Sequence, residues 1–119
     1  MTRVERMEGL QKARQAAQAV RDEIDRLNAG DPVASRQQER EPDRRRAIAQ
    51  IRLLERVIDN LEAAGVGGDL DLNQASLAEL DNLAGELDDA IRTSALVNVG
   101  LDTLGAVLTK AVRVKDILS

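Results

Sequence analysis

The feature that most constrains the fold is a long series of apolar residues at helical spacing between Leu70 and Leu118. Leucine, isoleucine and valine recur there mostly at intervals of three or four positions, which is the spacing of one face of an α-helix. The series consists of Leu72, Leu77, Leu80, Leu83, Leu87, Ile91, Val97, Leu101, Leu104, Leu108, Val112 and Leu118. We expect one or two amphipathic helices upstream to pack against this stretch.

The absence of five residue types limits both the core and the chemistry. The 119-residue chain contains no Phe, Tyr, Trp, His or Cys. Its core must therefore be aliphatic, which suits thin helix–helix seams better than a thick interior. Without His and Cys, the commonest general base, thiolate nucleophile and metal ligands are missing. The composition predicts a non-enzymatic protein with no cofactor and no metal.

Hydropathy provides no targeting or spanning signal. No apolar segment follows the basic residues near the N-terminus, and no run of about 18 apolar residues exists. We therefore expect a cytoplasmic protein and no membrane partner.

The predicted fold is a single all-α domain covering residues 1–119. It is an antiparallel bundle of three to four helices with coiled-coil-like seams, and completion of the bundle by a second copy remains open. Its predicted segments are a helix at about 3–28, a flexible linker at about 30–42, a helix at about 43–64, a Gly-rich loop at 65–70, a helix at about 73–97 and an apolar helix at about 100–118.

Local signals set these boundaries. Thr2 and Glu5 match a capping box at the start of the first helix. Pro42 is expected to interrupt any continuous helix, and Asp43 is expected to cap the next one. The glycines at 65–68 indicate a connection between helices, since no Lys accompanies them as in a phosphate loop. Near residues 98–100 we favour a kink or turn over one helix of more than 40 residues.

The last helix is apolar around most of its circumference, with one narrow polar strip. Such a helix is either central to a bundle or buried in an interface. The sequence therefore predicts a protein partner, with a second copy of the chain as the favoured one. The predicted assembly contact consists of Leu101, Leu104, Leu108 and Val112.

A second candidate surface is an acidic ridge. Residues 57–102 hold ten acidic residues and a single basic one, Arg92. The ridge consists of Glu79, Asp81, Glu86, Asp88 and Asp89. It is either solvated, or paired with Arg45, Arg52 and Arg56 of the preceding helix, or a docking surface for a basic target. The last interpretation makes the protein an acidic inhibitor of the immunity or anti-defence type.

Nucleic-acid binding is the third interpretation. It rests on Arg36, Arg40, Arg44, Arg45, Arg46, Arg52 and Arg56, because arginines neutralise phosphates. Four acidic residues interleave with them and the formal net charge is −4, both of which argue against a nucleic-acid partner.

Overall fold

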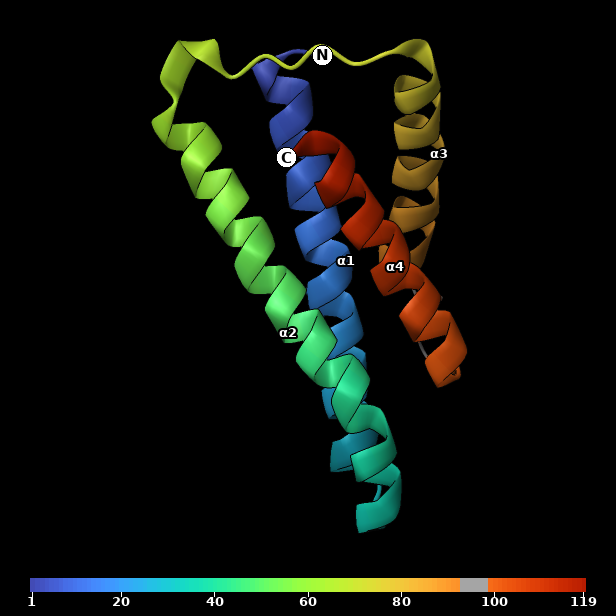
Figure 1. The fold of residues 1–119 in the computed structure, drawn as a ribbon. Helices are drawn as coiled ribbons and strands as arrows, with labels where there is room; N and C mark the ends of the chain where they lie inside the picture. Colours follow the sequence, from blue (N-terminus) through green and yellow to red (C-terminus); the bar gives the residue numbers. More distant parts are fainter. Residues whose placement is uncertain (93–98) are drawn as a thin grey trace.

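A computed structural model describes residues 1–92 and 99–119 (Figure 1). This part of the chain forms four α-helices, and each helix runs antiparallel to the one before it (Figure 1). They pack together as an all-helical bundle, so the predicted all-α class is confirmed. The helices are α1 (Arg3–Ala29), α2 (Ala34–Ala63), α3 (Gln74–Ile91) and α4 (Leu101–Leu118), with a short 3-10 turn at Gly65–Gly67.

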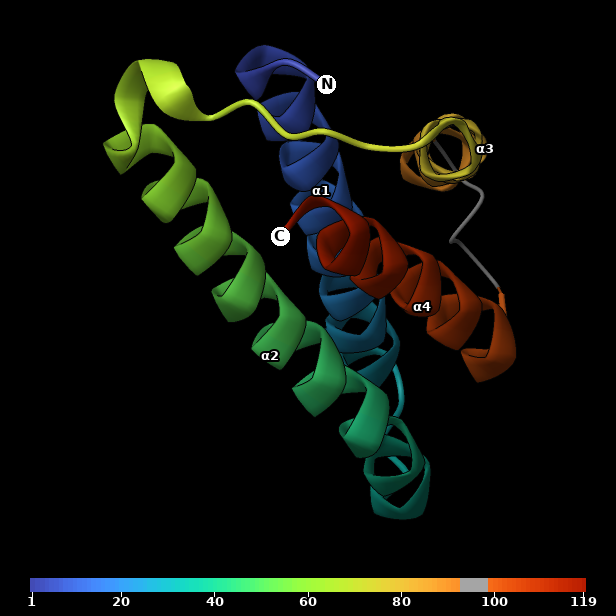
Figure 2. The same ribbon diagram turned by 45° about the horizontal axis from the view of Figure 1, so that its top comes forward.

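The helix that organises the bundle is α1, rather than the C-terminal stretch that the sequence favoured. It contacts α2, α3 and α4, with α2 and α3 on opposite sides of it (Figure 1, Figure 2). Ala13, Ala16 and Ala17 are completely buried, and such small side chains let neighbouring helices approach closely. The buried face of α1 also includes Leu10, Val20, Glu23 and Ile24.

The first turn of α1 carries the predicted capping box. The Thr2 hydroxyl accepts a hydrogen bond from the Glu5 amide, and the Glu5 carboxylate accepts one from the Thr2 amide. Side chains of the same turn also donate hydrogen bonds to carbonyl groups at the C-terminal ends of two other helices. Arg6 Nε donates to the carbonyl of Leu118 at 2.7 Å, and Arg3 Nε donates to that of Leu61 at 3.4 Å. Two arginines of α1 thereby complete the C-terminal ends of α4 and α2.

The predicted linker at 30–42 and the predicted helix start at Asp43 are wrong. α2 begins at Ala34 and continues through Pro42. A proline in a helix interior removes one hydrogen bond, at a cost of about 3 kcal/mol. The carbonyl that loses its partner belongs to Gln38, an exposed residue, so water can replace the missing N–H.

Contacts with the end of α1 hold this part of α2 in place. Gln37 Nε2 donates to the carbonyls of Asn28 and Asp31, at 3.2 and 2.7 Å. Farther along α2, Arg44 Nε donates to Asp25 Oδ1 at 2.7 Å. The polar residues that make the segment resemble a linker are therefore the ones that attach it to α1.

The connection from α2 to α3 uses the predicted glycines. Gly65 has a φ of +66°, in the left-handed region that glycine adopts without strain. Asn73 then caps α3, since its Oδ1 accepts from the Ser76 amide at 2.8 Å.

α3 ends at Ile91, before the predicted end near residue 97. Gly100 is the N-cap of α4, so α3 and α4 are separate helices rather than one continuous helix. The rest of the predicted kink region, including Asn98, lies outside the described residues. Within the described ranges, no helix combines the length and the apolar character needed to cross a membrane.

Candidate functional site

The four residues of the predicted assembly contact lie at different depths. Leu104 and Leu108 are completely buried in the chain's own core, where α4 packs against α1, α2 and α3. Leu101 and Val112 are half-buried. The apolar character of α4 is therefore largely accounted for by contacts within one chain. That any of these residues contacts a partner stays a prediction.

The acidic ridge is partly neutralised by basic residues of neighbouring helices. Arg113 of α4 donates to both carboxylate oxygens of Glu79, at 2.7 and 3.1 Å. Lys110 lies 3.3 Å from Glu86, and Lys12 of α1 lies 2.9 Å from Asp88. The expectation that the ridge pairs with the arginines of α2 is wrong, because α2 lies on the opposite side of α1 from α3 (Figure 1, Figure 2).

The pair between Arg113 and Glu79 also stabilises the charged form of the carboxylate. The hydrogen bond from Arg113 lowers the pKa of Glu79, and the positive charge of Arg113 acts in the same direction. Asp81 and Asp89 are exposed and form no ion pair with any of residues 1–92 and 99–119. The ridge thus offers fewer free negative charges than its sequence suggests.

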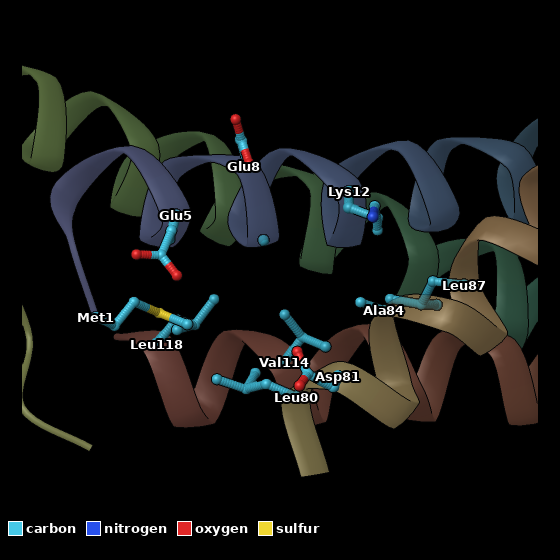
Figure 3. A pocket seen from close by; sticks show the side chains of 11 residues that line it. Met1, Glu5, Glu8, Lys12, Leu80, Asp81, Ala84, Leu87, Val114 and Leu118 are labelled. Carbon is cyan, nitrogen blue, oxygen red and sulfur yellow. The ribbon is translucent and has the colours of Figure 1, made fainter. Parts of the chain in front are cut away.

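One ridge residue, Asp81, also lines a cleft between α1, α3 and α4 (Figure 3). The cleft has a volume of about 190 Å³. For comparison, an apolar protein cavity of about 150 Å³ can hold a benzene molecule. The apolar lining is contributed by Met1, Leu80, Ala84, Leu87, Val114 and Leu118. The cleft is therefore large enough for one large apolar side chain.

Small residues help to form the cleft. Gly9 lies on the face of α1 that lines it, and a Cβ atom there would be 2.6 Å from Leu118 Cδ1. Its lack of a side chain lets the end of α4 lie close to α1. On α3, Ala84 adds a short side chain between the larger Leu80 and Leu87.

The N-terminus closes one end of this region. The Met1 ammonium donates to the Leu70 carbonyl at 2.9 Å, and the Leu70 amide donates back to the Met1 carbonyl at 3.0 Å. The Arg3 amide also donates to Asp69 Oδ1, at 2.8 Å. These bonds hold the segment before α3 against the start of α1, which positions Met1 beside Leu118 (Figure 3).

The rim of the cleft is predominantly acidic. Glu5 and Glu8 come from α1 and Asp81 from α3, and the Glu5 carboxylate points toward Met1 and Leu118 (Figure 3). Lys12 is the basic side chain of the rim, and its charge is paired with Asp88 at 2.9 Å. The field at the mouth therefore favours a ligand that carries positive charge near its apolar part.

The carboxylates around the cleft are accessible to solvent. Glu5, Glu8 and Asp81 are all exposed residues at its rim. In the described parts of the chain, no three acidic side chains are grouped so that they could hold a metal ion.

The sequence pointed to only part of this site. Glu5, Glu8, Gly9 and Lys12 have the i, i+3, i+4, i+7 spacing of one helix face, and this is the signal that could have identified the α1 side. The α3 side lies about 70 residues away in the chain, so its proximity depends on the fold. Comparisons with models of protein families, with curated proteins and with solved structures find no match to this chain.

Proposed function

We propose that this chain is a non-enzymatic protein-interaction module whose cleft receives one large apolar side chain of a protein partner. Lys or Arg residues next to that side chain would lie against the acidic rim. The observation that carries this proposal is the combination of an apolar cleft of about 190 Å³ with the carboxylates of Glu5 and Asp81 at its rim. This proposal combines two expectations from the sequence: a protein partner, from the apolar pattern, and a basic target, from the acidic ridge.

The size of the cleft limits how much binding free energy the buried side chain can contribute. Burial of one large apolar side chain contributes about 1.5–3 kcal/mol. This is less than the entropy lost on association, so the rim and surrounding surface must supply the remainder. Attraction between the acidic rim and a basic partner mainly accelerates association and confers specificity. We therefore propose a contact that depends on ionic strength.

The absence of aromatic residues permits a direct test. Because the chain has no Trp or Tyr, the fluorescence of an acetylated and amidated Lys-Trp-Lys peptide reports binding without protein background. We expect its emission to shift to the blue and its anisotropy to rise as protein is added. A Glu-Trp-Glu peptide is the matched probe of opposite charge, and we expect it to bind at least about tenfold more weakly, a difference of about 1.4 kcal/mol.

Two pairs of variants locate the binding site. Ala84→Phe should fill the cleft and abolish binding, whereas Ala78→Phe, at an exposed position of α3 outside the cleft, should leave it unchanged. Asp81→Lys should weaken Lys-Trp-Lys binding several-fold, whereas Asp89→Lys should change it less than twofold. Circular dichroism at 222 nm checks that each variant remains helical.

The same variants separate the cleft from the ridge as a whole. If Asp89→Lys weakens binding as much as Asp81→Lys does, and Ala84→Phe has no effect, the acidic ridge is the contact surface and the cleft is not. Equal binding of the two tryptophan peptides would also contradict a role for the acidic rim.

A further inference from the structure

The outward face of α2 carries three exposed arginines. Arg45, Arg52 and Arg56 are exposed and follow one another at spacings of seven and four residues, which places them on one side of the helix. Leu53, on the same side, has 37% of its surface exposed. Arg45 forms an exposed pair with Glu41 at 3.0 Å, while Arg52 and Arg56 form no ion pair within the described part of the chain.

This face points away from the bundle. Ala47, Leu54 and Leu61 lie on the opposite side of α2 and are buried. The arginines are therefore directed to solvent, and Arg52 and Arg56 are not paired with an acid within the described part of the chain. We call the surface formed by Arg45, Arg52, Leu53 and Arg56 the arginine face.

The opposite flank of the molecule carries the complementary charge. In both views, α1 and α4 lie between α2 and α3 (Figure 1, Figure 2). The exposed surface of α3 presents Asp89 and Glu86, the latter 3.3 Å from Lys110 of the same chain, with Asp81 at one edge. Asn82 and Gly85 lie among these acids on the exposed side of α3, and a Cβ atom at Gly85 would meet no other atom within 4 Å. No bulky side chain would therefore hold a second helix away from α3.

We infer that the arginine face of one copy docks on the α3 surface of a second copy. The span from Arg45 to Arg56 is about 16 Å and that from Asp81 to Asp89 about 12 Å, at about 1.5 Å per residue, so the two rows overlap along their lengths. Because the complementary faces lie on opposite flanks of one chain, the contact is head-to-tail. It produces a ring or an open chain of copies rather than a two-fold dimer.

The charge of the chain favours a second copy over a nucleic acid as the partner. Glu55 and Asp59 lie beside the arginines on α2 and would repel the closely spaced phosphates of a nucleic acid. A second copy instead presents its acids in a short row facing the arginines. The contact shares only Asp81 with the cleft, and the variants below replace residues outside the cleft, so it can be tested separately from the proposed partner binding.

Two charge-reversed chains test the inference. The first carries Arg52→Glu and Arg56→Glu, which lowers the formal charge from −4 by four, to −8. The second carries Glu86→Arg and Asp89→Arg, which raises it by four, to 0. Mass is measured by light scattering with refractive-index detection, over a concentration series at about 20 mM and 500 mM salt, because the chain does not absorb at 280 nm.

We expect the natural chain to associate at low salt and to dissociate at least tenfold more readily at high salt, where exposed charges are screened. Each reversed chain alone should remain monomeric, because its two faces then have the same sign. An equal mixture should associate again, since each arginine-bearing surface finds an acidic one. Recovery in the mixture supports this docking and excludes a simple effect of net charge.

Two results would overturn the inference. One is a natural chain that stays monomeric at about 1 mM in low salt. The other is self-association of the second reversed chain by itself, since loss of net charge alone then explains the behaviour. Retention of the natural chain on a polyanion resin, with no association between copies, would assign the arginine face to a nucleic acid instead.

Discussion

Arg40 of α2 reaches back to Asp31 in the connection that precedes the helix, with Nη2 3.3 Å from Oδ2. Both side chains are largely buried, at 15% and 11% exposure. The other guanidinium nitrogen of Arg40 donates to Asn28 Oδ1 at 3.1 Å. One side chain thus joins the end of α1, the connection and the second turn of α2, which makes the hairpin a defined structure.

Replacement of Pro42 tests whether α2 continues through this position. Pro42→Ala restores an N–H where the helix lacks one, so we expect the free energy of unfolding to rise by roughly 1–3 kcal/mol. Pro32→Ala is the matched control in the connection, where loss of proline should lower it by about 0.4–1 kcal/mol. Urea unfolding followed by circular dichroism measures both. An unchanged or lower stability for Pro42→Ala would mean that α2 is interrupted there.

Asp31 gives the hairpin a defined pH dependence. The hydrogen bond from the Val33 amide is the main cause of its lowered pKa, and Arg40 and Arg36 add to it. Because the folded state favours the carboxylate, this stabilisation is complete above the ordinary aspartate pKa of about 3.9 and is lost as the pH falls through the lower folded value. Between about pH 5 and pH 3, Asp31→Asn should therefore lose less stability than the natural chain.

Asp59→Asn controls for the removal of one negative charge from α2. It should lose stability with falling pH as the natural chain does. Parallel pH profiles for Asp31→Asn and the natural chain would exclude a role for Asp31 in holding the hairpin. The lowered pKa of Glu79 also makes stability fall with pH, but it does so equally in the natural chain, Asp31→Asn and Asp59→Asn, so it cancels in the comparison.

Leu108 distinguishes the core of one chain from an interface between chains. It is completely buried in a single chain, so Leu108→Ala should lower the free energy of unfolding by about 2–5 kcal/mol. Leu53→Ala, at a position with 37% exposure, should change it by no more than about 0.5 kcal/mol. The loss for Leu108→Ala should be the same at every protein concentration. A loss that appears only at high concentration would place Leu108 in a contact between copies.

Gly9 and Gly105 differ in the space around them, although both lie inside helices. Alanine is better than glycine in a helix interior by about 1 kcal/mol, and Gly105→Ala should be stabilising by that amount because its Cβ meets nothing within 4 Å. Gly9→Ala should lack this gain or be destabilising, since its Cβ would lie 2.6 Å from Leu118 Cδ1. Thermal unfolding compares the two, and equal gains would contradict the close packing of α1 and α4.

The features that local sequence determined depend on residues close together in the chain. The Thr2 capping box, the Asn73 cap and the apolar row of α2 at Ala47, Ile51, Leu54, Ile58 and Leu61 all follow from spacings of three or four residues. The same spacings predicted the all-helical class, because an aliphatic chain without aromatic residues buries its surface most readily along helix faces.

Tertiary structure alone decided which of these faces meet. It placed α1 at the centre, where buried alanines allow close approach, and it extended α2 through Pro42 by attaching Arg40 and Gln37 to the end of α1. It also paired Glu79 with Arg113 of α4 rather than with an arginine of α2. Charge and periodicity are properties of single helices, whereas the pairing of surfaces is set by packing between segments far apart in the chain.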